Sequence, residues 1–216
     1  MKKLWISIVM ICSLVFQVSA LSLTEQGVKE LDSANFLANE WIIRDVRIWL
    51  DTTGTQYELI GWGQMMAIMD EYRLHETITR KEVMKIVMKL SWKTITDTCR
   101  WAFSDVPADW WCKYIEAALD AWYIAVNPTF RPDDNITKTE AMKLVLKAKW
   151  VQKIKETNAW QSDYMETAYF YGIIDEKYTD FNANAYRGWI FTIATATIEK
   201  EDEIFEKGWI ISDEAM

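Results

Sequence analysis

The sequence has few of the residues from which metal sites and catalytic centres are built. Its 216 residues include one histidine, His75, and three cysteines, and no metal-ligand spacing is present. It also lacks a G-x-S-x-G segment, an H-E-x-x-H segment and a phosphate-binding loop. We therefore predict no metal, no cofactor and no enzymatic activity. The alternative, a secreted hydrolase, needs two carboxylates held at a fixed separation, which a sequence cannot test.

Positive charge is scarce as well. The chain has 24 basic and 32 acidic residues, which gives a formal net charge of −8. Binding to a phosphate backbone or to an anionic membrane surface needs a basic surface. The composition therefore argues against nucleic acid and against a polybasic membrane contact. An anionic ligand has to be bound by a few local cations.

The one long apolar run lies at the N-terminus. A basic start at residues 1–3, an apolar run at 4–18 and small residues up to position 20 predict a secretory signal peptide over 1–20. The run is short for a membrane span, so a retained anchor helix is the less favoured alternative. In an exported chain, Cys99 and Cys112 can form a disulfide, the alternative being two free thiols.

Internal repetition is the strongest positive signal in the sequence. Residues 78–89 and 136–147 agree in character at almost every position, and a weaker third copy spans 185–198. Apolar residues recur on one face at helical spacing, so each copy predicts an amphipathic helix. We call these three segments the motif helices.

The first two motif helices also carry a start signal. Thr79 with Glu82, and Thr137 with Glu140, match the Thr-x-x-Glu capping box. In this motif the threonine hydroxyl accepts from the N3 amide, and the glutamate accepts from the N-cap amide. The third copy lacks both residues.

A second helix is predicted before each motif helix. Residues 114–121 resemble 164–171, and 33–40 form the version in the first copy. The loop between the two helices contains an aromatic residue in every copy, namely Tyr72, Phe130 and Tyr178. One such unit cannot bury its own apolar face, whereas three packed together can. The sequence therefore predicts an all-α fold.

These features together resemble a known family. The segment Phe103-Ser104-Asp105-Val106, the loop Phe130-Arg131-Pro132-Asp133 and the helix start at 136–140 are similar to an S-layer homology repeat. The resemblance is strong over 103–150, good over 72–92 and looser over 160–199. It implies three helix-loop-helix repeats packed as a pseudo-threefold helical bundle with binding grooves between the lobes. The implied division is a divergent repeat at 28–92, a second at 103–150, a degenerate third at 160–199, and an acidic C-terminal tail at 200–216.

The resemblance also implies a function. Such triplets attach exported proteins non-covalently to the bacterial cell wall by binding an anionic, often pyruvylated, secondary polysaccharide. The basic residue after the capping threonine contacts that polymer, and here these positions are Arg80, Lys138 and Arg187. An apparent insertion at 45–63 and the missing capping residues of the third copy leave the number of working grooves open. The alternative is a structural or protein-interaction module that assembles with other surface-layer proteins without binding polysaccharide.

The chemistry expected of this site is anion binding. A basic residue in the first helical turn is repelled by the helix dipole, typically by ~0.3–1 kcal/mol, so its recurrence suggests function. We expect helix N-terminal amides and the cation to converge on an acid group, with Trp110 and Trp111 stacking on sugar faces. Asp105 is expected either to orient a cation or bind a hydroxyl, or to be an ordinary loop or N-cap aspartate. The alternative for the three cations is exposure to solvent or pairing with acids such as Asp105, Asp133 and Asp134.

Tryptophan is unusually frequent and glycine unusually rare, with thirteen and seven residues respectively. Trp41 and Trp122 occupy the position that Gly172 holds in the third copy, and Trp92 and Trp150 each follow a motif helix. At such helix exits the left-handed conformation normally selects glycine. We hypothesise that these codons are UGA, read as glycine in some bacterial lineages and translated here as tryptophan. The alternative is that they are genuine surface or groove tryptophans.

Overall fold

The computed structural model describes residues 24–44, 62–149 and 156–206, and this part of the chain is helical with connecting loops and isolated β-bridges. The all-α prediction is therefore confirmed. The signal peptide at 1–20, most of the apparent insertion, Trp150 and residues 207–216 lie outside the described residues. Within the described ranges, no helix combines the length and apolar character needed to span a bilayer.

The helices lie where the repeated pattern predicts them. The described helices are α2 (Glu25–Asn39), α3 (Trp62–Tyr72), α4 (Arg80–Leu90), α5 (Cys112–Asp120), α6 (Lys138–Ala148), α7 (Trp160–Phe170) and α8 (Arg187–Glu199). The motif helices are α4, α6 and α8, and the helices that precede them are α2, α5 and α7, which we call the outer helices. Helix α3 was not predicted and has no counterpart among the described residues of the other two units, which contain α5 with α6 and α7 with α8.

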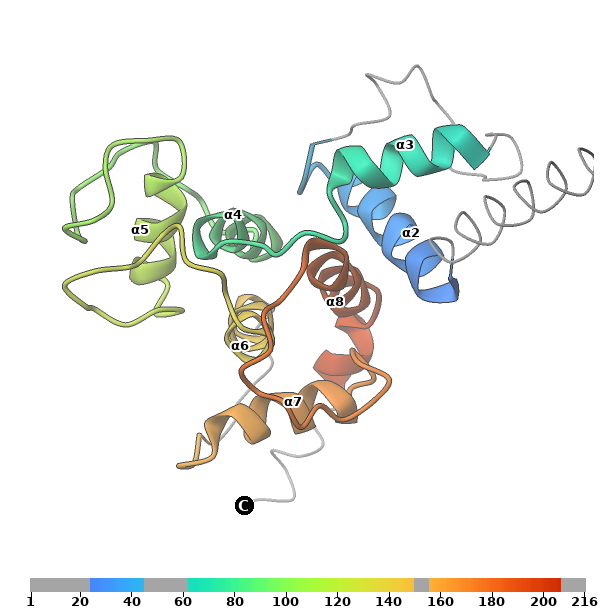
Figure 1. Ribbon diagram of the computed structural model, residues 1–216. Coiled ribbons are helices and arrows are strands. Elements are labelled where there is room, and N and C mark those ends of the chain that lie inside the picture. The colour runs from blue at the N-terminus through green and yellow to red at the C-terminus, as the bar shows by residue number, and fades with distance from the viewer. Residues whose placement is uncertain (1–23, 45–61, 150–155, 207–216) are drawn as a thin grey trace, which may run out of the picture.

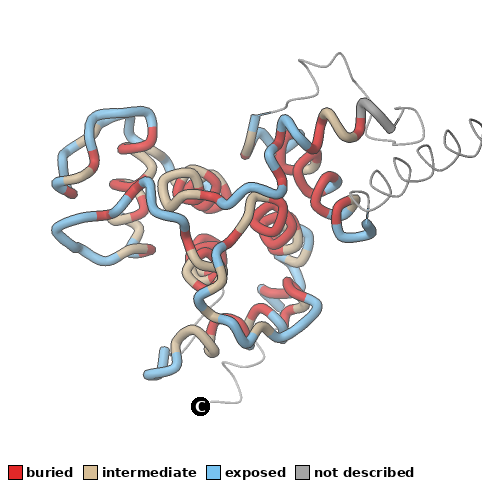
Figure 2. The backbone as a smooth tube through the Cα atoms, viewed as in Figure 1, coloured by how far each residue is buried: buried red, intermediate tan, exposed pale blue. Residues whose placement is uncertain are grey.

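The motif helices form the centre of the molecule. Helices α4, α6 and α8 pack against one another, and Figure 1 shows them side by side between the outer helices. Helix α5 packs on α4, α7 on α6, and α2 on α8, so each outer helix lies on a motif helix from a different unit. The buried residues concentrate where these helices meet (Figure 2). The first unit thus contacts the third as well as the second.

A closed set of backbone hydrogen bonds joins the segments that precede the motif helices. The amide of Ile78 donates to the carbonyl of Ala185 at 3.2 Å, that of Ala185 to Ile136 at 2.9 Å, and that of Ile136 to Ile78 at 3.2 Å. All three residues are fully buried. Each unit therefore donates to one neighbour and accepts from the other, and the bonds are shielded from water.

The second unit is further tied together by its cysteines. Cys99 and Cys112 form a disulfide with a Cα–Cα distance of 5.8 Å, as predicted for an exported chain. Beside it, the buried carboxylate of Glu116 accepts hydrogen bonds from the amides of Arg100 at 2.7 Å and Ala102 at 3.0 Å. The segment before α5 is thus held to that helix by covalent and polar contacts.

Part of the predicted C-terminal tail packs on the body of the protein. Residues 201–206 are helical, and Ile204 within them is buried. Glu201 forms an ion pair with Lys149 at 2.8 Å, which joins this segment to the end of α6. The first part of the predicted tail, residues 201–206, therefore belongs to the folded body of the protein.

The tryptophans at the helix exits adopt the conformation that favours glycine. Trp41, Trp92 and Trp122 have φ angles of 58°, 54° and 61°, beside 65° for Gly172. A fourth, Trp101, which the repeat pattern did not single out, has a φ of 62°.

The hydrogen bonds at these exits are those of a Schellman motif. The amide of Trp122 donates to Leu119 and that of Tyr123 to Ala118, and corresponding bonds occur at Trp41 and Gly172. The side chains of Trp41 and Trp122 are 81% and 85% exposed, so packing does not account for them. These observations support glycine as the native residue at the described positions.

Changing Trp41, Trp92 and Trp122 to glycine together should stabilise the fold. Relief of left-handed strain is worth on the order of 1 kcal/mol per position, and little packing is lost. Urea unfolding followed by far-UV circular dichroism measures the change. Trp110→Gly, at an exposed position outside the left-handed region, is the matched control and should give no gain. Equal or lower stability of the triple variant would show that these tryptophans are adapted to the fold.

Reduction of the disulfide should destabilise the chain. The bridge spans a sequence separation of 13, and closing a loop of this size contributes roughly 3 kcal/mol through the unfolded state. We expect the urea midpoint to fall when dithiothreitol is added, and to fall by a similar amount in a Cys99→Ser, Cys112→Ser variant without reductant. An unchanged midpoint would contradict a contribution of the bridge to stability.

Candidate functional site

The three predicted cations stand at the first residue of their helices. Helix α4 begins at Arg80, α6 at Lys138 and α8 at Arg187. Both predicted capping boxes are formed. The N-cap amides of Thr79 and Thr137 donate to the carboxylates of Glu82 and Glu140 at 3.0 and 3.1 Å. The local part of the site is therefore as predicted.

The expectation that free helix amides would bind the anion is wrong. The first amide of each motif helix donates to a loop carbonyl of the neighbouring unit. These bonds run from Arg80 to Asp134 at 3.0 Å, from Lys138 to Ala183 at 2.9 Å, and from Arg187 to Glu76 at 2.9 Å. Because these donors are already used within the protein, an anion has to be bound by side chains.

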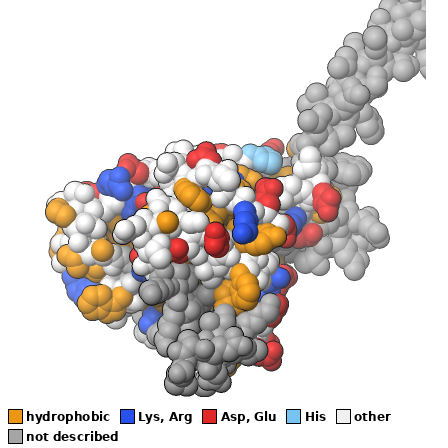
Figure 3. Space-filling view, turned by 90° about the horizontal axis from the view of Figure 1, so that it is seen from below, with side chains coloured by type: hydrophobic (Ala, Val, Ile, Leu, Met, Phe, Trp, Pro, Cys, Tyr) orange, Lys and Arg blue, Asp and Glu red, His pale blue; other side chains and the backbone are white. Residues whose placement is uncertain are grey.

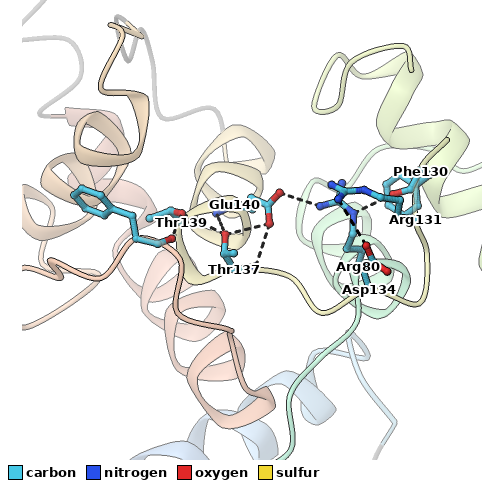
Figure 4. A network of polar contacts seen from close by, with 8 residues as sticks. Arg80, Phe130, Arg131, Asp134, Thr137, Thr139 and Glu140 are labelled. Atoms are coloured by element: carbon cyan, nitrogen blue, oxygen red, sulfur yellow. Dashed lines mark hydrogen bonds and ion pairs between the residues drawn. The ribbon is translucent and has the colours of Figure 1, made fainter. Parts of the chain in front are cut away.

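Arg80 pairs with the capping glutamate of the next unit. Its Nη1 lies 3.0 Å from Oε1 of Glu140, and its Nε donates to the carbonyl of Phe130 at 3.0 Å (Figure 4). The guanidinium also lies over the ring of Phe130, 5.0 Å from its centroid. The partner is not one of the loop aspartates considered from the sequence. Arg80 is thus largely neutralised, although its side chain remains 17% exposed.

Arg187 repeats this arrangement with the first unit. Its Nη2 donates to Oε1 of Glu82, the capping glutamate of α4. Burial raises the pKa of Glu82, but hydrogen bonds from Thr79 and the charge of Arg187 outweigh burial, so the pKa lies below its usual value. The Nε of Arg187 is buried and has no hydrogen-bond acceptor among the described residues.

Lys138 pairs with no such carboxylate of the described residues, because the third unit places Trp189 where the others have their capping glutamate. The ammonium instead lies among aromatic rings, with centroids at 4.4 Å for Tyr178, 5.4 Å for Trp189 and 5.6 Å for Tyr186. Burial lowers the pKa of Lys138, and the charges of nearby acids, namely Glu176, Asp180 and Glu30, oppose that effect. The negative surroundings make this cation a poor receptor for an anion.

Two grooves with equivalent linings flank α4. One, the α4/α8 groove, has a volume of about 220 Å³, and the other, the α4/α6 groove, about 450 Å³. Six lining positions correspond between the two grooves: Arg187 and Arg80, Glu82 and Glu140, Lys85 and Lys143, Tyr72 and Phe130, Arg73 and Arg131, and Trp110 and Trp160. The same constellation is thus built twice, each time from residues of more than one unit.

Asp105 positions the loop at the α4/α6 groove. Its carboxylate accepts hydrogen bonds from the amides of Phe130 at 2.8 Å and Arg131 at 2.7 Å. Burial raises the pKa of Asp105, but these hydrogen bonds lower it by more than burial raises it. The pKa of Asp105 therefore lies below its usual value. Arg131 has a φ of 60°, and the corresponding Arg73 has a φ of 57°. Asp105 is therefore a loop aspartate that holds a strained arginine at the groove.

The two candidate stacking residues differ in exposure. Trp110 is 50% exposed and lines the α4/α8 groove, with the Nζ of Lys85 5.5 Å from its ring. Trp111 is buried, its Nε1 donates to Asp109 at 3.1 Å, and Lys81 lies over its ring. The stacking role expected of Trp111 is therefore wrong, because its face is not available to a sugar.

Lys85 and Lys143 were missed as candidate cations. They stand at equivalent positions of α4 and α6, so the repeat itself contained the signal. Lys143 pairs with Glu156 at 2.9 Å, whereas Lys85 has no ion pair among the described residues. Burial lowers the pKa of Lys85, and the charge of Lys89 lowers it further.

A comparison with protein families agrees with the resemblance noted from the sequence. The family model described as the S-layer homology domain matches residues 102–142, which span α5, the loop with Phe130 and the start of α6. No curated protein matches the chain in a sequence search. Residues 102–142 of this chain therefore match the S-layer homology domain.

Proposed function

We propose that the chain attaches non-covalently to the bacterial cell wall by binding an anionic polysaccharide in the two grooves beside α4. S-layer homology domains are non-catalytic modules that locate proteins at the cell surface and bind cell-wall polymers in general. The observation that carries the proposal of an anionic ligand is that each of the two grooves is lined by arginine, lysine and tryptophan at equivalent positions.

The charge of the grooves supports an acidic ligand. The α4/α8 groove is lined by four basic and two acidic side chains, and the α4/α6 groove by three basic and one acidic. Both are thus locally positive in a chain whose net charge is −8. Elsewhere the charges are mixed, and basic and acidic side chains lie next to one another on the face drawn in Figure 3. A carboxylated polymer is attracted to the grooves rather than to the surface as a whole.

The aromatic residues support a sugar ligand. Trp110 in one groove and Trp160 in the other offer an indole against which the apolar face of a sugar ring can pack. A neighbouring arginine grips a carboxylate with two parallel hydrogen bonds, whereas a lysine acts as a point charge. A neutral sugar gains only the first of these interactions, so the combination favours acidic polymers.

The arrangement of the units supports three tandem repeats, divided as 28–92, 103–150 and 160–199. We propose that they are related by a pseudo-threefold axis through the centre of the motif helices. The ring of hydrogen bonds between Ile78, Ala185 and Ile136 fits such an axis, since each residue makes the same bond to the next. The exported location proposed for the chain fits the disulfide between Cys99 and Cys112.

Wall binding should depend on the acid groups of the polymer and on the groove tryptophans. The purified chain should sediment with isolated wall fractions and lose binding when the carboxyl groups of the polysaccharide are reduced to alcohols. Binding should also weaken in high salt, because both grooves rely on partly exposed charges. A Trp110→Ala, Trp160→Ala variant should bind at least about tenfold more weakly, since stacking is lost in both grooves.

The matched control is Trp101→Ala, which removes an exposed tryptophan outside both grooves and should leave wall binding unchanged. Retention of the wild-type chain on carboxyl-reduced walls would refute the proposed ligand. Self-association of the chain without polymer, detected by analytical ultracentrifugation, would favour the surface-layer assembly role instead.

A further inference from the structure

One carboxylate of the chain already occupies a basic site beside α6. Glu156 accepts a hydrogen bond from the hydroxyl of Tyr164 at 2.6 Å and from Nζ of Lys143 at 2.9 Å, and it lies 4.0 Å from Nζ of Lys147. The hydrogen bond from Tyr164 is the main reason that the pKa of Glu156 lies below its usual value, with the two lysines adding to it against burial. The surroundings thus favour a carboxylate anion at this position.

The same residue types recur beside α4. The corresponding pairs are Lys143 and Lys85, Lys147 and Lys89, Tyr164 and Tyr114, and Trp160 and Trp110. The aromatic residues have the same geometry, with ring centroids 6.4 Å apart and an edge-on arrangement both for Trp110 with Tyr114 and for Trp160 with Tyr164. Helix α5 packs on α4 as α7 packs on α6, so the two sites are built on equivalent helix pairs.

The lysine next to the tryptophan is also similarly placed. Nζ of Lys85 lies 5.5 Å from the ring centroid of Trp110, and Nζ of Lys143 lies 4.8 Å from that of Trp160. Both lysines line their respective grooves and are only partly exposed. A cation held in this way keeps its side chain ordered for a ligand, because the ring restricts its rotamers.

The two sites differ in the partner of the lysine. The position that corresponds to Glu156 is Val106, which is buried and carries no charge. No carboxylate of the described residues forms an ion pair with Lys85, and the pKa of Lys85 is lowered by burial and by Lys89 with no acid opposing. The adjacent Arg187 also has a buried Nε without an acceptor among the described residues. In the α4/α6 groove, Lys143 already donates to Glu156. The equivalent Lys85 in the α4/α8 groove has no carboxylate partner among the described residues, so it is available to a ligand.

We infer that Lys85, beside Trp110, binds the carboxylate of an acidic sugar in the α4/α8 groove, and that Glu156 takes the place of this carboxylate at Lys143, which lines the α4/α6 groove. The inference rests on the proposed function and names the group that the first groove recognises. The α4/α8 groove is therefore selective for acidic sugars, and the α4/α6 groove binds them more weakly.

The test is a titration of the ¹⁵N-labelled full chain with sodium glucuronate, followed through the indole NH signals, with glucose as the neutral probe. Glucuronate should shift the signal of Trp110, identified with a Trp110→Phe variant, and glucose should shift it much less. Lys85→Gln should weaken glucuronate binding at Trp110 by about tenfold, because a charge-assisted contact is lost. Lys143→Gln, the matched change in the other groove, should change the affinity for glucuronate at Trp110 by no more than about twofold.

A second variant probes the role of Glu156. Glu156→Gln keeps the shape of the side chain but removes its charge, which should free Lys143 and produce a new glucuronate-dependent shift at Trp160. No response of Trp110 to glucuronate, or an equal response in the Lys85→Gln chain, would overturn the inference. If the chain then still sediments with acidic wall polymer, the proposed function stands and only this inference fails. If the chain binds neither glucuronate nor the wall, both the inference and the proposed function fail.

Discussion

The backbone hydrogen bonds between Ile78, Ala185 and Ile136 set the positions of the three motif helices. Each of these residues donates to one unit and accepts from another, so no unit can satisfy its own backbone without the other two. Each bond adds only about 1 kcal/mol net, but leaving a buried amide unpaired costs about 1–3 kcal/mol. The units therefore have to assemble together, and partial arrangements are penalised.

This ring also determines which side chains meet. It brings the first residue of one motif helix next to the capping glutamate of another, as in the pairs of Arg80 with Glu140 and Arg187 with Glu82. A basic residue at a helix start is unfavourable for its own helix. For Arg80 and Arg187 this cost is offset by an ion pair with the neighbouring unit, so these two cations have a structural role. The same pairs line the two grooves, so the packing of the units and the proposed ligand binding depend on the same side chains.

Features that depend on neighbouring residues in the chain were predictable. The helix starts, both capping boxes, the disulfide and the left-handed exits at Trp41, Trp92 and Trp122 all follow from local patterns. The capping boxes also located Arg80 and Lys138, because helix capping fixes where a helix begins, and the weaker third copy of the repeat located Arg187.

Features that depend on the order of the units were not predictable. The partners of Arg80 and Arg187 come from other units, so local acids such as Asp133 were the wrong candidates. Trp111 is buried, and Lys81 of α4 lies over its ring, a contact that the sequence around Trp111 could not show. Lys85 resembles any exposed lysine of an amphipathic helix until the lining of the α4/α8 groove is known. Helix α3 follows a segment that resembles no other part of the sequence, so the internal repeat could not predict it.

Each groove is lined by residues of more than one unit. A change in the sequence of one unit therefore does not affect one groove alone. The third unit has lost its capping threonine and glutamate, and Trp189 alters the junction with Lys138. Yet Arg187 from that unit completes the α4/α8 groove with residues of the first unit. The unit that departs most from the motif therefore still supplies an arginine to the groove in which we propose that the ligand binds.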